Sequence, residues 1–375
     1  MASGHPWIFS SDVEDRGGAG PGAVVHVVEH RGRPLGTAHF STTSQICLRM
    51  LSARAVAVDL AFFRERILAA AEYRKRVVSG TDAFRLVYGE ADRLPGLVVD
   101  RYADWLVVQT LDQGMDAARQ TIVDCLQELF SPRGIVLRND VPVRQKESLP
   151  LETVVAAGEA PERVPIELNG LRLLADPLRG QKTGIYLDQR ENYVAASRYA
   201  HGRALDCFTS TGGFALHMAG QCEHVTAVES SAEALALARV NAQANGLANV
   251  EFREANVFDL LNSQELAGRR FSTVVLDPPA FAKSRSSLEG AIRGYKEINY
   301  RALKLLEPGG ILITCSCSHH MPEATLLETV ASAALDAGRT LRVLERRTQA
   351  RDHPILLTVP ETHYLKCLIL EVMET

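Results

Sequence analysis

The segment TCSCSHH, residues 314–320, combines two thiols one residue apart with a pair of histidines. Thiolates and imidazoles both bind zinc, and a thiolate is also a strong nucleophile, so the segment predicts either part of a zinc site or a covalent catalytic centre. A structural zinc site needs four ligands, commonly two closely spaced pairs, and the other cysteines do not supply a second pair. This spacing makes zinc the weaker interpretation, and both stay open here.

A thiolate beside a nucleobase would have a specific use. Carbon 5 of cytosine is a poor nucleophile, but addition of a thiolate to carbon 6 creates an enamine-like centre that accepts a methyl cation. A free thiol with an ordinary pKa near 8.5 is only a few per cent ionised at neutral pH, so the site must activate it. Cys315 and Cys317 lie two apart in an extended run and face the same side of a strand, so spacing does not choose between them.

A second candidate is LDPPAF, residues 276–281, which follows an apolar run. Two consecutive prolines cannot continue a strand ladder, so they fix a rigid turn that holds Asp277 and Phe281 at the edge of the sheet. The carboxylate can contact the polar edge of a base, and the aromatic ring offers a stacking face. The turn therefore predicts a nucleobase site, although prolines also occur in purely structural turns.

A third candidate is LDCFTSTGGFALHMA, a strand that runs through a glycine turn into a helix. Gly212 and Gly213 would let the backbone approach a ligand, and Asp206 stands at the end of the strand. Glu229 ends the next apolar run, where a carboxylate accepts hydrogen bonds from ribose hydroxyls. No G-x-G-x-x-G pattern or P-loop lysine is present, so the set suits a nucleoside without pyrophosphate, such as S-adenosylmethionine. Asn256 ends the third run and could contact adenine.

These residues need a scaffold that brings strand ends together. Beyond Pro165, the apolar runs ALDCF, HVTAVE, VEFREA, STVVLDPP and GGILITCS alternate with segments of helical periodicity, which predicts a doubly wound α/β domain. In such a sheet ligands bind at the carboxyl ends of the strands, where every candidate lies. The preceding chain predicts a small antiparallel β-unit up to about Leu51 and then a compact α+β unit that ends in the polar segment near residues 150–165.

Composition excludes several classes of protein. The 375 residues are 46% hydrophobic and 23% charged, which is ordinary for a globular chain of more than one domain. No apolar run reaches the roughly 18 to 20 residues of a membrane helix. The seven cysteines lack a spaced framework, so we expect reduced thiols and a cytoplasmic protein. The net charge of -4 means that any nucleic acid must be held by local basic clusters such as Arg74–Arg76.

The motifs together resemble one family. GQKTGIYLDQRENY, LDCFTSTGGFA, LDPPAF, RGYKEIN and TCSCS are similar to segments of the bacterial ribosomal RNA large subunit methyltransferase I family. HPWIFS near the start resembles that family's PUA RNA-binding module, and ARDHPILLTVPETHYLK resembles its C-terminal segment. The resemblance therefore covers nearly the whole chain.

The resemblance implies an α/β fold with three domains. These are an N-terminal β-rich PUA-like domain over residues 1–57 that lacks its first strand, a central α+β (EEHEE-like) domain over 58–164, and a Rossmann-like class I methyltransferase domain over 165–375. It also implies S-adenosylmethionine as the cofactor, 5-methylcytosine in 23S rRNA as the product, and no metal.

The motifs and the resemblance together assign residues. The family's S-C-S nucleophile corresponds to Cys317, and Asp277 is expected to contact the pyrimidine ring. Residues expected to bind the cofactor are Tyr186, Asp188, Gln189, Arg190, Asp206, Phe208, Thr211, Gly212, Gly213, Glu229, Ser230, Asn256 and Asp277. Residues expected to bind the substrate are Lys182, Phe281, Lys283 and Arg285. Asn256 departs from the acid that is usual at its position, and no cysteine in the DPPAF turn assists elimination.

Two alternatives remain at this point. One is an rRNA methyltransferase that acts on another base atom, such as guanine nitrogen 7, for which Cys317 would be unnecessary. The other is a non-catalytic RNA-binding protein that kept a cofactor fold. The expected partner is 23S rRNA or an assembly intermediate of the large subunit, with no membrane partner, and a homodimer is left open.

Overall fold

The computed structural model describes residues 4–263, 266, 268–281 and 287–374, and the chain divides into two compact units. The first comprises Met1–Gly170, Leu174–Leu187 and Arg351–Thr362, and the second comprises Leu171–Leu173, Asp188–Ala350 and His363–Thr375. The chain therefore passes between the units several times. Among the described residues, no helix combines the length and apolarity needed to cross a membrane.

The first unit begins with a four-stranded antiparallel sheet of order β1-β4-β3-β2. Its strands are β1 (Trp7–Phe9), β2 (Val24–Val28), β3 (Pro34–Phe40) and β4 (Ile46–Ser52), and η1 (Ser10–Asp12) follows β1. β2 alternates exposed and half-buried residues, the period-2 pattern of a strand with one face toward solvent. The fully buried core is small, so this sheet depends on its neighbours in the unit.

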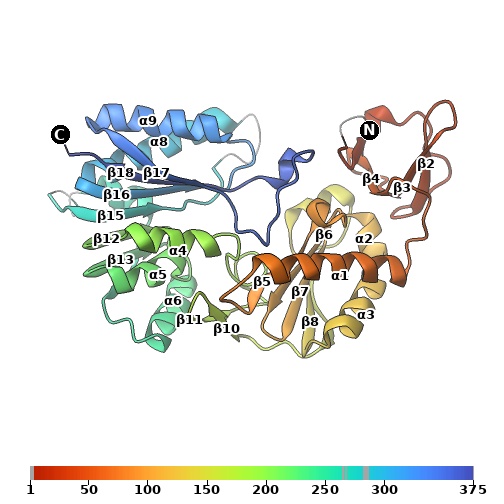
Figure 1. Ribbon diagram of the computed structural model, residues 1–375, viewed down its shortest axis with the longest axis horizontal. Coiled ribbons are helices and arrows are strands. Elements are labelled where there is room, and N and C mark those ends of the chain that lie inside the picture. Colours follow the sequence, from red (N-terminus) through yellow and green to blue (C-terminus); the bar gives the residue numbers. More distant parts are fainter. Residues whose placement is uncertain (1–3, 264–265, 267, 282–286, 375) are drawn as a thin grey trace. The chain divides into compact units, whose positions relative to one another are not determined.

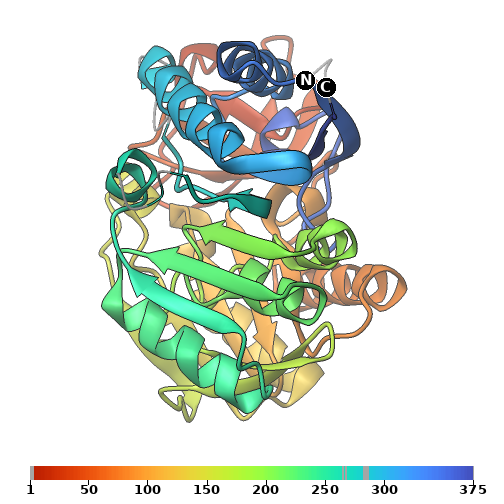
Figure 2. The ribbon, with the colours of Figure 1, turned by 90° about the vertical axis from the view of Figure 1, so that its left-hand side faces the viewer.

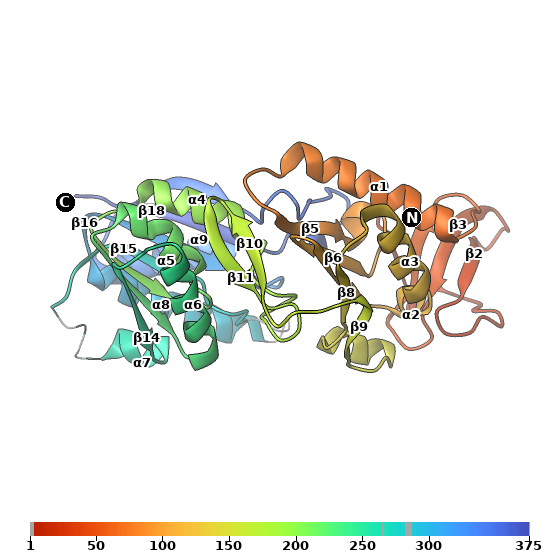
Figure 3. The ribbon, with the colours of Figure 1, turned by 90° about the horizontal axis from the view of Figure 1, so that it is seen from below.

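A five-stranded sheet of order β5-β6-β7-β8-β9 forms the rest of the first unit. The strands are β5 (Ala83–Tyr88), β6 (Leu97–Tyr102), β7 (Trp105–Thr110), β8 (Gly134–Arg138) and β9 (Thr153–Gly158); the helices are α1 (Leu60–Val77), α2 (Gln113–Ala117), α3 (Arg119–Phe130), η2 (Gly89–Asp92) and η3 (Pro142–Glu147). Helices α1 and α3 lie together against this sheet, as Figure 3 shows, and share one apolar core with it. Asp59 caps α1 by accepting a hydrogen bond from the Phe62 amide.

Buried charges join the two sheets of the first unit. Glu147, on η3, accepts hydrogen bonds from Ser41 Oγ at 2.6 Å and from Arg49 Nη2 at 2.8 Å. His39 is buried beside this group, and burial lowers its pKa to about 4, so its ring is neutral near pH 7. Because a buried charge is costly without a partner, these contacts fix how the four-stranded sheet docks.

The segment Arg351–Thr362 belongs to the first unit although it follows most of the second in sequence. The buried Arg74 of α1 pairs with Asp92 at 2.5 Å and donates to the carbonyl of Asp352 at 2.8 Å. The Asp352 carboxylate accepts from the Arg85 amide at 2.8 Å. These bonds satisfy a buried guanidinium and hold the segment, which includes η7 (Pro360–Thr362), against α1 and β5.

The second unit is a seven-stranded sheet of order β14-β13-β12-β15-β16-β18-β17. Its strands are β12 (Arg203–Cys207), β13 (His224–Glu229), β14 (Val250–Glu254), β15 (Phe271–Leu276), β16 (Leu306–Ser316), β17 (Leu341–Arg347) and β18 (Lys366–Val372). The first five are parallel, and β18 pairs antiparallel with both β16 and β17. Figure 2 shows the green strands β12, β13 and β14 side by side. A two-stranded sheet of β10 (Val164–Leu168) and β11 (Leu171–Ala175) precedes these strands in the sequence.

Helices cover both faces of the large sheet, as Figure 1 shows for α4, α5 and α6 on one face and α8 and α9 on the other. The helices are α4 (Arg190–Tyr199), α5 (Gly213–Met218), α6 (Ala232–Ala244), α7 (Val257–Asn262), α8 (Leu288–Leu305) and α9 (Glu323–Ala337), with η4 (Ala219–Gln221) after α5. Every residue of β15 is buried, as expected for a central strand with helices on both sides. Ser231 caps α6, and Gly338 ends α9 in the left-handed conformation.

The doubly wound sheet predicted from the alternating apolar runs is confirmed. Strand order reverses between β12 and β15, which makes their carboxyl ends the expected ligand edge. Some elements were not predicted: β9 occupies the segment taken as a polar boundary, and β17 and β18 complete the sheet beyond β16. The exposed valines of β9 explain the first omission, because an edge strand lacks a buried apolar run.

Candidate active site

The loop from β12 to α5 is organised around Asp206. Its Oδ2 accepts hydrogen bonds from Thr209 Oγ1 at 2.5 Å and from the Ala215 amide at 2.9 Å, so one carboxylate oxygen fixes both ends of the loop. Burial raises the pKa of Asp206 to about 7, because a charge is poorly solvated there. The Asp206 carboxyl group therefore fixes the conformation of this loop through its hydrogen bonds.

The same loop has an unusual backbone. Phe208 and Ser210 adopt positive φ values of 65° and 51°, which non-glycine residues rarely do and which concentrate at functional sites. Gly212 has φ of 93°, so its lack of a side chain is required by the turn. A Cβ on Gly213 would lie 2.5 Å from the Tyr193 hydroxyl oxygen, so the space at Gly213 is taken by α4 packing on α5. The turn therefore explains Gly212 and helix packing explains Gly213, in addition to the close approach of a ligand expected from the sequence.

Glu229 lies at the end of β13 beside this loop. Its carboxylate accepts hydrogen bonds from the backbone amides of Ser210 at 3.1 Å, Ser230 at 2.8 Å and Ser231 at 3.1 Å, and from Ser230 Oγ at 3.1 Å. The acid therefore joins two strand-end loops and is held in a fixed position. Thr211 belongs to the loop after β12, and its carbonyl accepts a hydrogen bond from Asn241 at 3.3 Å.

Asn256 is the N-cap of α7. Its Oδ1 accepts hydrogen bonds from the amides of Phe258 at 2.9 Å and Asp259 at 3.3 Å. An amide oxygen committed to two backbone donors leaves the NH₂ group to face a ligand, so contact with adenine would use Asn256 as a donor.

The DPPAF turn is tied to the segment before α4. Gln189 Nε2 donates to Asp277 Oδ1 at 3.0 Å, while Gln189 Oε1 accepts from Asn192 at 2.7 Å. Gln189 is buried and Asp277 is half-buried. A carboxylate held by a buried amide is preorganised at the end of β15, next to the end of β16.

Phe281 packs into an aromatic row. Its ring centroid lies 4.7 Å from that of Tyr295 and 5.7 Å from that of Phe258. With Phe258 and Arg293 it lines a cavity of about 440 Å³. Phe281 therefore combines a packing role with access to a cavity, and Arg293 adds a cation there. The predicted contacts Lys283 and Arg285 lie outside the described residues.

The cysteines differ in access. Six of the seven are buried, and Cys317 is half-buried. Cys315 faces Cys367 in the pairing of β16 with β18, and burial raises its pKa, which disfavours its thiolate. Cys317 Sγ lies 4.0 Å from the carbonyl oxygen of Pro278, so this thiol is beside the DPPAF turn. Access and position favour Cys317 as the reactive thiol.

The segment 182–190 is divided between the units. In the first unit, Thr183 is buried and donates to Asp100 at 2.5 Å, while Lys182 lies over the Tyr186 ring at 4.8 Å. In the second unit, Asp188 accepts from the Tyr364 hydroxyl at 2.6 Å. Arg190 is also buried there and begins α4. Gln189, also in the second unit, directly contacts the DPPAF turn through Asp277.

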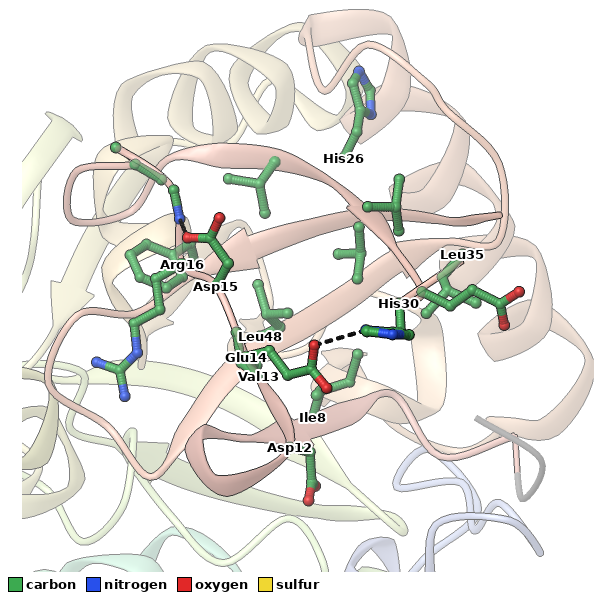
Figure 4. A pocket seen from close by; sticks show the side chains of 18 of the residues that line it. Ile8, Asp12, Val13, Glu14, Asp15, Arg16, His26, His30, Leu35 and Leu48 are labelled. Atoms are coloured by element: carbon green, nitrogen blue, oxygen red, sulfur yellow. Dashed lines mark hydrogen bonds and ion pairs between the residues drawn. The ribbon is translucent and has the colours of Figure 1, made fainter. Parts of the chain in front are cut away.

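A second cavity, of about 870 Å³, lies in the first unit over the N-terminal sheet. Figure 4 shows its lining side chains, with a hydrogen bond of 3.0 Å between Glu14 and His30 at its rim. The rest of the lining combines apolar residues such as Ile8 and Val25 with charged residues of the segment after β1, such as Asp12 and Arg16. Among the described residues, no three His, Cys, Asp or Glu side chains form a metal-binding cluster.

Comparison with known proteins identifies the chain. Ribosomal RNA large subunit methyltransferase I of Klebsiella pneumoniae is 43% identical over 378 residues, covering 98% of this chain and 94% of that protein. The protein of the same name from Escherichia coli O157:H7 is 41% identical, covering 98% and 96%. The chain belongs to the ribosomal RNA large subunit methyltransferase I family.

Two family models and a solved structure agree with this fold. The model of PUA-like domains matches residues 1–53, and a methyltransferase domain model matches residues 199–356. A putative S-adenosylmethionine-dependent methyltransferase from Streptococcus mutans superposes with a TM-score of 0.84 at 21% identity, over 99% of this chain and 96% of that one. The predicted combination of a PUA-like domain with a Rossmann-like methyltransferase domain is therefore confirmed.

The residues at the sheet edge fit the family's nucleoside cofactor. Within the part of the chain that the structure describes, Asp206 Oδ1 and Ser210 Oγ are buried without a hydrogen-bond partner. An orphaned carboxylate oxygen beside a strained loop suits a cationic ligand, and Glu229 suits a ribose. The sequence analysis missed Tyr295, Tyr364 and Lys366 around Cys317, because their positions depend on α8 and β18 packing there.

The accessibility of Cys317 gives a direct prediction. Limiting iodoacetamide added to the folded protein at pH 8 should alkylate Cys317 before any other cysteine, because the other six thiols are buried. Peptide mass mapping at several times measures the order. As a control, all seven cysteines should react in guanidinium chloride. Earlier labelling of Cys315 or Cys222 in the folded protein would contradict the assignment.

Proposed function

We propose that this protein methylates carbon 5 of a cytosine in 23S rRNA of the large ribosomal subunit, with Cys317 as the nucleophile. Its cofactor is S-adenosylmethionine. The observation that carries the proposal is the half-buried thiol of Cys317, 4.0 Å from the Pro278 carbonyl, at the end of the strand beside Asp277. An enzyme that methylates guanine nitrogen 7 would not need this thiol as a nucleophile.

The cofactor would be held by the edge of β12 and β13. Glu229 suits the ribose hydroxyls, and the loop framed by Asp206 lies beside it. Asn256 would contact adenine through its NH₂ group, since its oxygen caps α7. When bound, S-adenosylmethionine supplies an electrophilic methyl group to the site.

The protein would hold the cytosine out of its stack against the DPPAF turn. Enzymes that modify a base must expose it, and the proline pair keeps Asp277 and Phe281 in place for its polar edge and its face. Asp277 keeps its orientation through Gln189. Arg293, at the neighbouring cavity, suits contact with phosphate.

Cys317 would make carbon 5 reactive. Its thiolate forms a bond to carbon 6 of the cytosine, and the electron pair of the 5,6 double bond becomes available at carbon 5. Carbon 5 would gain the methyl group as the bond between that group and the cofactor's sulfur breaks, which leaves S-adenosylhomocysteine. A base would then remove the proton at carbon 5, the 5,6 double bond would re-form, and the bond to the Cys317 sulfur would break. The thiolate is thereby regenerated.

The cofactor site predicts a specific loss of affinity. Replacing Glu229 with Ala should weaken S-adenosylmethionine binding by about 1–3 kcal/mol, roughly 5- to 150-fold in Kd, because ribose hydroxyls lose their acceptor. Isothermal titration measures the change. Glu223→Ala, an exposed acid just before the same strand, is the matched control and should bind like the wild type. Equal affinity of Glu229→Ala and the control would refute the role of Glu229.

The covalent step predicts a trapped adduct. RNA containing 5-fluorocytosine has no removable proton at carbon 5, so it should remain bound to the wild type and to Cys315→Ala, but not to Cys317→Ala. Denaturing gels and mass spectrometry of the cross-linked peptide measure this. An adduct that persists in Cys317→Ala and disappears in Cys315→Ala would overturn the choice of nucleophile. Methylation of cytosine by the double variant would exclude the covalent mechanism.

A further inference from the structure

The segment that carries Cys317 has a buried serine on each side of the thiol. The amide of Ser318 donates to Ser316 Oγ at 3.4 Å, and the Tyr295 hydroxyl lies 3.4 Å from Ser318 Oγ. Ser316 and Ser318 are buried, while Cys317 between them is half-buried. The two serines therefore anchor the segment and leave the intervening thiol accessible.

The contact made by the Cys317 thiol does not favour its ionised form. A carbonyl oxygen such as that of Pro278 accepts a hydrogen bond from a thiol, but it repels a thiolate. Because only the thiolate adds to carbon 6, a positive charge near sulfur would favour the reactive form.

Lys366 brings a cation to this segment. It is the first residue of β18, pairs with Ser316 of β16, and is buried. Its Nζ donates to the carbonyl of Ser318 at 2.7 Å and to the carbonyl of Tyr364 at 2.8 Å. An ammonium has three donors, and the third has no acceptor among the residues that the structure describes. The charge is thus bound next to Cys317 by two neutral carbonyls.

We propose that Lys366 is a positioning residue that fixes the Cys317 segment and supplies the positive charge under which the thiol ionises. The proposal rests on the proposed role of Cys317 as nucleophile. The thiol proton passes to solvent before addition to the base, while Lys366 keeps its own proton throughout. The same charge stabilises the thiolate when it is released at the end of the reaction.

The electrostatics around Lys366 agree with this role. Burial lowers the pKa of Lys366 to about 8, and Cys317 and then Glu323 oppose that shift, so the ammonium is mostly charged at pH 7. Other groups face the site: Glu323 is paired with Arg346 at 2.7 Å, and Tyr295, whose pKa burial raises to about 12, stays neutral. Asp277 adds a negative charge from the DPPAF turn, and His319 lies beside Tyr364.

The proposal separates the charge of Lys366 from its hydrogen bonds. Lys366→Gln keeps a donor for the carbonyls but removes the charge, whereas Lys366→Arg keeps the charge. The rate of Cys317 alkylation by iodoacetamide is measured from pH 5.5 to 10 on the full chain. In Lys366→Gln the midpoint of this profile should move up by about one pH unit, and in Lys366→Arg it should stay near the wild type. Lys304→Gln, an exposed lysine of α8, is the matched control.

Transfer of methyl groups to 23S rRNA gives a second readout. At pH 7, kcat of Lys366→Gln should fall about tenfold, since one pH unit changes the thiolate fraction by that factor, while KM for S-adenosylmethionine stays constant. Raising the pH should restore most of the rate. A profile of Lys366→Gln that coincides with the wild type, or equal impairment of the Arg and Gln variants, would overturn the proposal.

A reciprocal measurement covers the case in which Lys366→Gln does not fold. Coupling between two titrating groups acts in both directions, so Cys317→Ala should lower the titration midpoint of Lys366, followed by NMR of lysine labelled with ¹³C at Cε. An unchanged midpoint would overturn the proposal. Adduct formation between the wild type and 5-fluorocytosine RNA separates the hypothesis that Cys317 is the nucleophile from the hypothesis that Lys366 promotes its ionisation. An adduct without the pH shift contradicts only the role of Lys366, and the shift without an adduct contradicts only the role of Cys317.

Discussion

Parallel pairing of β12, β15 and β16 is the constraint on which this site depends. Cys207 pairs with Leu276, and Leu276 pairs with Thr314, so the three strands end almost level with one another. The residues that follow each strand therefore emerge at the same edge. A shift of one residue between β15 and β16 would turn their side chains to opposite faces and separate Asp277 from Cys317.

Buried polar bonds then convert this alignment into a fixed geometry. Gln189 orients Asp277, Glu229 joins two loops, and Lys366 holds the carbonyl of Ser318. Buried hydrogen bonds in a site of low dielectric are stiff and costly to break, so the groups need little reorganisation when substrate arrives. Strained residues such as Phe208 are tolerated because the surrounding bonds over-determine the loop.

Sequence predicted the parts of this site that depend on local pattern. Apolar runs indicated the parallel strands, and the proline pair indicated a turn after Leu276. The role of Asn256 as a helix cap could have been predicted, because an Asn before an apolar run is a helix-start signal. The sequence analysis instead assigned Asn256 to adenine binding. Lys366 could not be found this way, since its place follows from the pairing of β18 with β16. The packing of Tyr193 into the space at Gly213 is equally non-local.

The most direct test of this account is the chemical identity of the methylated nucleoside. The purified protein would be incubated with S-adenosylmethionine carrying a labelled methyl group and with 23S rRNA from cells lacking the gene, and the digested nucleosides would be separated and weighed by mass spectrometry. The account predicts the label in 5-methylcytidine. Label in a methylated guanosine, or in no nucleoside although the cofactor binds, would contradict it.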